Sequence, residues 1–148
     1  MIKKLLIKNF KSIKNTLIEL NPKINIFVGE NDSGKSTILE ALSIITTGRL
    51  HFYPFERQIK ANLFNADIRG GYIKDIKEGR KPEPPKIIIE AYLDDDIDPK
   101  ISGKNNELYE NVPGIRMVVE MDRDYSEVYK QMLSSSSVYD IPVELYKV

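Results

Sequence analysis

Residues 29–36 carry the side chains with the clearest capacity for chemistry. The segment Gly29-Glu30-Asn31-Asp32-Ser33-Gly34-Lys35-Ser36 matches the pattern G-x-x-x-x-G-K-[ST], which is typical of loops that surround the phosphates of a nucleotide. Such a loop binds polyanions because its backbone N–H groups converge, and because the helix behind them adds the positive end of its dipole. The spacing therefore predicts a phosphate-binding site.

Each residue type in this loop suits one task. Gly29 lets the chain turn off the preceding segment, and Gly34 removes a Cβ where backbone meets phosphate. We expect Lys35 to reach the β- and γ-phosphates as the catalytic residue and the Ser36 hydroxyl to ligate Mg²⁺. The expected ligand is a purine nucleoside triphosphate, ATP with Mg²⁺. The predicted nucleotide-binding residues of the loop are Gly29, Asn31, Asp32, Ser33, Gly34, Lys35, Ser36 and Thr37.

A structural alternative exists for the same residues. The segment from Gly29 to Thr37 could be no more than the start of a capped helix, with Ser33 or Asp32 as the cap. The flanking sequence favours the phosphate loop, because the pattern has its meaning between a strand and a helix.

The residues on either side predict those two elements. Ile24-Asn25-Ile26-Phe27-Val28 is a nearly continuous apolar run, which indicates a central strand covered on both faces of a sheet. From Lys35 onward the apolar residues fall on one helical face until Gly48 supplies a stop. Before them, residues 2–7 and 16–20 are predicted to form an antiparallel pair of strands.

The second part of the chain predicts mostly strands. Residues 49–86 have weak periodicity, and we expect an excursion with little regular structure that ends in an extended proline-rich stretch at 81–86. Residues 87–93 and 115–121 are predicted strands, paired as a hairpin.

Two further elements are predicted near the C-terminus. A short helix is expected at 126–133 with Val128, Tyr129 and Met132 facing inward, and a polar serine loop follows it. Residues 143–148 are predicted to form a last strand.

Composition limits the class of protein. A chain of 148 residues with 41% hydrophobic residues is long enough for one globular domain. It has no cysteine and one histidine, His51, so a disulfide framework and a thiolate zinc site are excluded and a reducing cytoplasm fits best. No apolar stretch is long enough to predict a membrane span.

The N-terminal residues resemble a known family. Asn9-Phe10-Lys11-Ser12-Ile13 and Ile24 to Leu42 are similar to the start of ABC-type ATPase heads related to SMC and RecF proteins, and within that group to the OLD (overcoming lysogenization defect) family. The resemblance is strong over residues 1–47. It continues, more weakly, into the segments at 84–90 and 141–146.

That resemblance carries expectations about fold and partners. It implies an α/β fold, the N-terminal lobe of an ABC-type P-loop NTPase head, with a mixed and partly antiparallel sheet around one main helix. Residues 1–48 would form the nucleotide-binding core, and 49–148 an antiparallel-strand subdomain with connecting loops, of one incomplete domain. Lys11 and Ser12 would lie near the base and sugar. Full-length members dimerise around ATP and often carry a Toprim nuclease domain.

Several groups that an ATPase of this kind needs are not evident in the sequence. Catalysis requires an acidic strand end that holds Mg²⁺ and polarises water, and Glu90 and Glu120 end apolar runs but are better interpreted as strand residues on a solvent face. Leu133 to Ser137 lacks the glycines of an LSGG-like segment. Neither Gln58 nor Gln131 can be assigned as a sensor of the γ-phosphate.

Three functional hypotheses remain open. The first is the ATP-binding lobe of an ATPase that acts on DNA or licenses a nuclease, with slow or no hydrolysis by this chain alone and a homodimer or a C-terminal ATPase or nuclease segment as partner. The second is a regulatory module that binds nucleotide without turnover. The third is a small nucleotide kinase, which the position of the glycine loop disfavours.

Two smaller features also allow two interpretations. The lysines near the N-terminus could form a basic strip for nucleic acid, or a solvated face; they are Lys3, Lys4, Lys8, Lys11 and Lys14. His51, beside Phe52, Tyr53 and Phe55, could stack on a base, although ordinary packing is the more common role of such residues.

Overall fold

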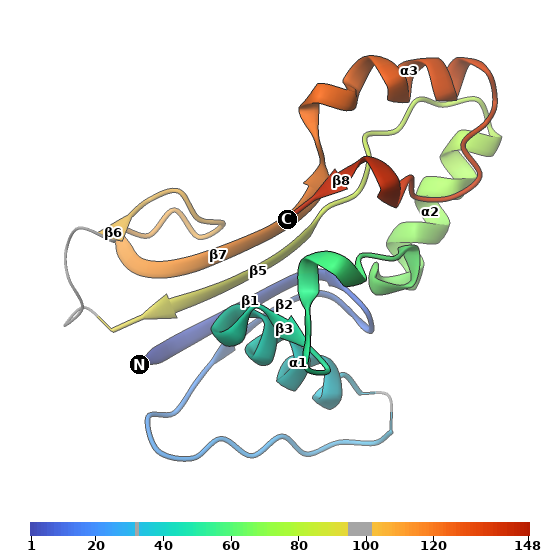
Figure 1. The fold of residues 1–148 in the computed structure, drawn as a ribbon. Helices are drawn as coiled ribbons and strands as arrows, with labels where there is room; N and C mark the ends of the chain where they lie inside the picture. Colours follow the sequence, from blue (N-terminus) through green and yellow to red (C-terminus); the bar gives the residue numbers. More distant parts are fainter. Residues whose placement is uncertain (32, 95–101) are drawn as a thin grey trace.

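A computed structural model describes residues 1–31, 33–94 and 102–148 as one sheet with helices beside it (Figure 1). The strand order is β2-β1-β5-β7-β6, and β8 also pairs with β7. Every pairing in this sheet is antiparallel. The strands are β1 (Ile2–Phe10), β2 (Ile13–Glu19), β5 (Ile87–Leu93), β6 (Ser102–Gly103), β7 (Val112–Met121) and β8 (Tyr146–Lys147).

The predicted N-terminal strand pair is confirmed, with longer strands than expected. Phe10 pairs with Ile13, so Lys11 and Ser12 alone connect β1 to β2. Lys11 has a positive φ of 49°, the left-handed conformation that such tight connections require. The connection therefore projects from the end of the hairpin as a narrow turn.

The main helix, α1 (Lys35–Thr47), has the predicted bounds, although Leu39, predicted on its apolar face, is 58% exposed. It buries Ala41, Ile44 and Ile45 against the sheet face that carries Leu5 and Ile7 of β1 and Ile89 of β5. Burial of each such aliphatic side chain contributes roughly 1.5–3 kcal/mol. Gly48 ends the helix with a φ of 68°, and its N–H donates to the Ile44 carbonyl oxygen, which is the expected left-handed stop.

The predicted central strand at 24–28 is wrong for this chain. These residues form irregular chain between β2 and α1 (Figure 1), and Ile24, Ile26 and Val28 are 73%, 79% and 88% exposed. A strand inside a sheet needs neighbours for its backbone hydrogen bonds and its side chains. No described strand pairs with this segment. The segment therefore lies outside the sheet despite its apolar composition.

The prediction of little regular structure at 49–86 is wrong in part. A hairpin of β3 (Arg49–Leu50) and β4 (Tyr53–Pro54) follows α1, and α2 (Ala66–Lys77) follows two short 3₁₀ turns. Asn65 caps α2 by accepting a hydrogen bond from the Asp67 N–H. The sequence did not predict α2, because Gly70 and Gly71 inside it have low helix propensity. Residues 81–86 are extended and unpaired, as predicted.

The C-terminal predictions have mixed outcomes. The β5–β7 hairpin is confirmed, with Ile89 opposite Met117, and so is the short helix, α3 (Ser126–Ser134), which buries Tyr129. Val128 is exposed rather than inward. The last predicted strand shrinks to β8, because residues Val143–Leu145 form a 3₁₀ turn. None of the described helices is long and apolar enough to cross a bilayer.

Candidate functional site

The N-terminus of α1 is open. Its N-cap is Gly34, at a φ of 94°, no side chain caps the helix, and its first turn contains no acidic residue. The Ser33 cap of the alternative interpretation is therefore not formed, and Asp32 lies outside the described residues. An uncapped helix start leaves N–H groups and the positive end of the dipole available to an anion.

The ammonium group of Lys35 lies inside the loop that precedes the helix. It donates to the carbonyl oxygens of Gly29 (2.7 Å) and Glu30 (2.5 Å), and it lies 3.1 Å from the Ser33 hydroxyl. A Cβ added at Gly29 would meet the Ser33 Oγ at 2.7 Å, so the loop closes tightly at this glycine. These oxygen atoms occupy the coordination positions that phosphate oxygens would take around the same cation.

A hollow of about 340 Å³ lies beside this loop. Polar residues and one glycine line it, and the Ser12 and Thr37 hydroxyls are 2.8 Å apart within it. The residues that line it are Lys11, Ser12, Asn31, Gly34, Lys35, Ser36 and Thr37. The structure thus brings together seven of the ten predicted site residues; Gly29 and Ser33 contact Lys35 instead. The donors fit a polyanion of phosphate type.

Two buried asparagines hold Lys11 and Ser12 at this hollow, and sequence reasoning missed both. The Asn65 side chain donates to the Lys11 carbonyl oxygen (2.9 Å), and the Asn9 side chain accepts from the Asn65 N–H (3.0 Å). The Lys11 N–H donates to Leu63 (2.8 Å). The helix-cap signal of Asn65 was the only trace of this arrangement in the sequence.

Lys11 is engaged by a carboxylate rather than being free. Its ammonium donates to Glu40 Oε1 (2.7 Å) and lies 2.6 Å from Oε2. His51 Nε2 lies 3.0 Å from Glu40 Oε1. Among the described residues no group of three or more His, Cys, Asp or Glu side chains could hold a metal ion.

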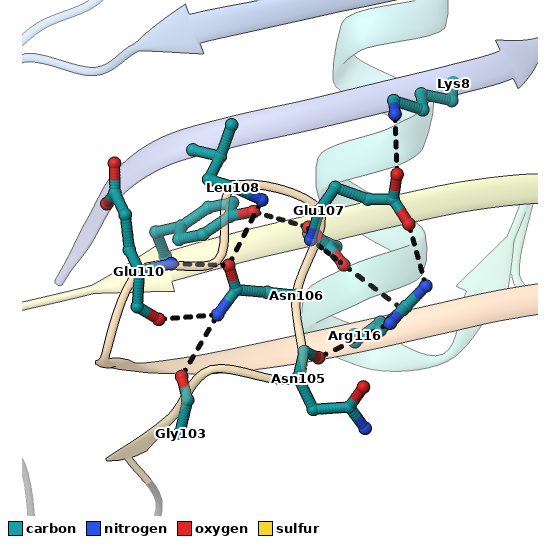
Figure 2. Close-up of polar contacts among 10 residues, drawn as sticks. Lys8, Gly103, Asn105, Asn106, Glu107, Leu108, Glu110 and Arg116 are labelled. Carbon is teal, nitrogen blue, oxygen red and sulfur yellow. Dashed lines mark hydrogen bonds and ion pairs between the residues drawn. The ribbon is translucent and has the colours of Figure 1, made fainter.

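The expectation that Glu90 faces solvent is wrong. Glu90 is 2% exposed; its carboxylate pairs with Arg116 (3.1 Å) and accepts hydrogen bonds from the Tyr92 hydroxyl (2.5 Å) and the Glu107 N–H. Figure 2 shows Glu107 between Lys8 (2.6 Å) and Arg116 (2.9 Å). Lys8 holds the pKa of the Glu107 carboxyl below its usual value, with Arg116 adding to the effect.

This polar network lies on the sheet face away from α1. Side chains alternate between faces along a strand, and Ile89 and Ala91, on either side of Glu90, belong to the core against which α1 packs. Glu120 follows the core residue Val119 and pairs with Lys86 (2.7 Å). Neither carboxylate is therefore positioned beside the loop at 29–37.

The lysines of the N-terminal strip are largely neutralised. Lys4 pairs with Glu110 (2.8 Å), Lys8 with Glu107, and Lys11 with Glu40, while Lys3 lies 3.5 Å from Asp94. The paired carboxylates cancel much of the positive electrostatic potential of these lysines. The interpretation as a nucleic-acid surface loses its electrostatic basis at these positions.

Comparison with known proteins identifies the family of this chain. The family model described as "AAA ATPase domain" matches residues 1–137. An ATP/GTP phosphatase of Helicobacter pylori is 47% identical over 51 residues, which are 34% of this chain and 14% of that protein. A DNA replication and repair protein RecF of Streptococcus pneumoniae is 38% identical over 61 residues, which are 41% of this chain and 16% of that protein.

The matched segments thus span about one seventh of the length of these relatives. The family model, by contrast, covers nearly the whole chain, from the β1–β2 hairpin through the loop and α1 to the start of the C-terminal turns. This chain belongs to the AAA ATPase domain family.

Proposed function

We propose that this chain is the Mg-ATP-binding lobe of an OLD-, SMC- or RecF-like ATPase. The observation that carries the proposal is the open start of α1 with the Lys35 ammonium inside the adjacent loop. ATP phosphates replace the loop carbonyls around Lys35 and accept hydrogen bonds from the unpaired N–H groups at the start of the helix. Each charge-assisted hydrogen bond contributes roughly 1.5–3 kcal/mol, so a few of them dominate binding.

The remaining loop residues have subordinate roles in this proposal. Gly29, Asn31, Asp32, Ser33, Gly34 and Thr37 belong to the nucleotide-binding loop, and Lys11 and Ser12 lie near the base and sugar. The Ser36 hydroxyl would hold Mg²⁺, and the ion would supply positive charge beside the phosphates.

A carboxylate from outside this lobe completes catalysis. Glu90 and Glu120, which end the two apolar runs, are held in ion pairs on the sheet face away from α1. A chain without an acidic group beside the γ-phosphate hydrolyses ATP slowly or not at all. The complementary group comes from a second copy or from a C-terminal ATPase or nuclease segment, and the full assembly couples ATP to DNA transactions or nuclease-based defence.

The exposed segment at 24–28 supports the same division of labour. The run at 24–28 is nearly continuously apolar, and Ile24, Ile26 and Val28 are exposed, so the segment has a strand composition without a strand partner among the described residues. In the complete assembly this segment enters a sheet beside strands supplied from elsewhere, while residues 49–148 form the subdomain whose strands β5 and β7 continue the antiparallel β1–β2 pair of residues 1–48.

Calorimetric titration tests the proposal. The purified chain with Mg²⁺ is titrated with ATP, and compared with Lys35→Ala and with Lys14→Ala, which removes an exposed lysine of β2 outside the hollow. We expect saturable binding to the native chain and to Lys14→Ala, and affinity at least tenfold weaker for Lys35→Ala. No binding to the native chain at millimolar ATP contradicts the proposal.

A turnover assay separates the two forms of the proposal. Binding without turnover, together with nucleotide-dependent association with a C-terminal partner, favours the non-hydrolysing regulatory module. Binding without turnover that becomes rapid hydrolysis when the complementary segment is added favours the ATPase lobe. Robust Lys35-dependent hydrolysis by this chain alone means that it contains an acidic partner that neither Glu90 nor Glu120 provides.

A further inference from the structure

The turn between β3 and β4 has an unusual composition. Leu50 pairs with Tyr53, so His51 and Phe52 alone form the turn, and both have positive φ values, 48° and 72°. Such two-residue turns normally contain Asn-Gly or Asp-Gly, because bulky side chains are strained in this conformation. A strained backbone of this kind points to a function for the side chains it presents.

The rest of the fold holds the turn in place. The Gln58 side chain donates to the carbonyl oxygens of Leu50 (2.7 Å) and Tyr53 (3.0 Å), which flank the turn. Phe55, which follows the hairpin, is buried in the core, and its N–H donates to the Gly48 carbonyl oxygen. These contacts stabilise the strained turn. A strained backbone persists only where the surrounding structure holds it in this way.

The side chains of the turn face solvent rather than the core. Phe52 is 92% exposed, and His51 is also exposed. Together with Leu39 of α1 they line a hollow of about 450 Å³, which Glu40 and Ser43 also border. An exposed apolar surface with a polar rim marks a ligand site.

An ion pair links this hollow to the proposed phosphate site. Glu40 borders this hollow, and its carboxylate contacts both Lys11 and His51. Lys11 in turn lines the phosphate hollow. Ser36, Glu40 and Ser43 also share one face of α1, at spacings of four and three residues. At 1.5 Å of rise per residue they lie about 6 and 10 Å apart along the axis, which is the reach of a nucleoside from its phosphates.

We propose that the His51–Phe52 turn is the platform on which the base of the bound nucleoside triphosphate stacks. The inference rests on the proposed function, because it assigns the base end of the same ligand. Phe52 supplies an exposed ring and Leu39 an apolar edge, while Glu40 fixes His51 beside them. Stacking on an aromatic ring suits any base, and the assignment therefore concerns affinity rather than choice of base.

The test compares ATP with tripolyphosphate, which lacks a base. Phe52→Gly removes the ring and favours the turn, because glycine adopts a positive φ without strain, so the variant folds at least as well as the native chain. We expect its Kd for Mg-ATP to rise about tenfold, with the Kd for tripolyphosphate unchanged. Tyr53→Ala, which removes the neighbouring exposed aromatic side chain outside this hollow, leaves both values unchanged.

A fluorescent variant gives an independent measurement. The chain contains no tryptophan, so Phe52→Trp reports only on the turn, and its emission changes on addition of ATP but not of tripolyphosphate. Native affinity of Phe52→Gly for ATP, or an equal loss for ATP and tripolyphosphate, overturns the platform while leaving the phosphate site intact. If the native chain binds neither ligand, the proposed function itself fails.

Discussion

The Lys35 ammonium lies 2.7 Å from the carbonyl oxygen of Gly29, six residues earlier in the chain. Through this contact the start of the loop folds back against the Lys35 side chain. A triphosphate must replace this carbonyl in the coordination of Lys35, because an ammonium group has only three donors. The geometry of Gly29 therefore affects ligand binding more than it affects the stability of the fold.

Gly29→Ala should weaken ATP binding by about tenfold. The added Cβ meets the Ser33 Oγ at 2.7 Å and displaces a side chain that borders Lys35, whereas the loop is exposed and contributes little to stability. Calorimetry gives the affinity and thermal unfolding gives Tm, which should stay within about 2 °C.

Gly70→Ala is the matched control for that variant. Gly70 lies inside α2 with nothing within 4 Å of an added Cβ, so alanine should raise stability by about 0.5–1 kcal/mol and leave ATP binding unchanged. Equal ATP affinities of Gly29→Ala and the native chain would contradict the role given to the loop.

Glu90→Gln should destabilise the chain without altering ATP affinity. The buried carboxylate pairs with Arg116 and accepts from Tyr92 and Glu107. Loss of its charge removes one of the two carboxylates that pair with Arg116, Glu107 being the other, and weakens these buried hydrogen bonds, at a cost of about 1–3 kcal/mol. Urea unfolding measures the loss, and ATP titration measures the affinity.

Glu120→Gln provides the comparison, because Glu120 pairs with Lys86 at a partly exposed position. Its loss of stability should stay below about 1 kcal/mol. A fall in ATP affinity or turnover with Glu90→Gln, at temperatures where the variant is folded, would show that this carboxylate does serve the nucleotide.

The ion pair of Lys8 and Glu107 should make stability depend on acid pH. Lys8 lowers the pKa of Glu107 in the folded chain, so the pair stabilises the fold above the unfolded value of about 4.3 and loses this contribution as the pH falls through the lower, folded value. The pair is partly exposed, which limits its contribution to about 0.5–1 kcal/mol.

Lys8→Met isolates this effect. Unfolding free energies of native chain and variant should differ near pH 7 and converge at acid pH, once the carboxyl is protonated in the folded as well as the unfolded state. A difference that is the same at both pH values would assign the effect to packing of the lysine stem instead.

Ile26→Ala and Ile89→Ala should differ sharply in stability. Ile26 is exposed in the irregular segment, and its truncation should cost less than about 0.5 kcal/mol. Ile89 is fully buried in β5, and its truncation should cost about 2–5 kcal/mol. Denaturant unfolding of the two variants measures both values, and a large loss at Ile26 would show that the segment at 24–28 is packed after all.

Local patterns were sufficient for the elements whose stability is local. The spacing of Gly29, Gly34 and Lys35 predicted the loop, because loop conformation and helix start depend on neighbours in the chain. The face of α1 and its stop at Gly48 followed from helical periodicity and from the freedom of glycine to adopt a positive φ. The β1–β2 hairpin followed from alternation and a short connection, and the strands β5 and β7 from their β-branched composition.

Tertiary structure decided everything that depends on partners distant in the sequence. The apolar run at 24–28 looks like a buried strand, yet burial requires neighbouring strands, and no described residue pairs with it. Glu90 looks like an exposed strand residue, yet Arg116 and the chain at 107 enclose it. The lysine strip is neutralised by carboxylates far along the chain, and the exposure of Phe52 depends on how Gln58 and Phe55 anchor its turn. Sequence periodicity reports which face a side chain prefers, and only the folded chain determines what lies opposite that face.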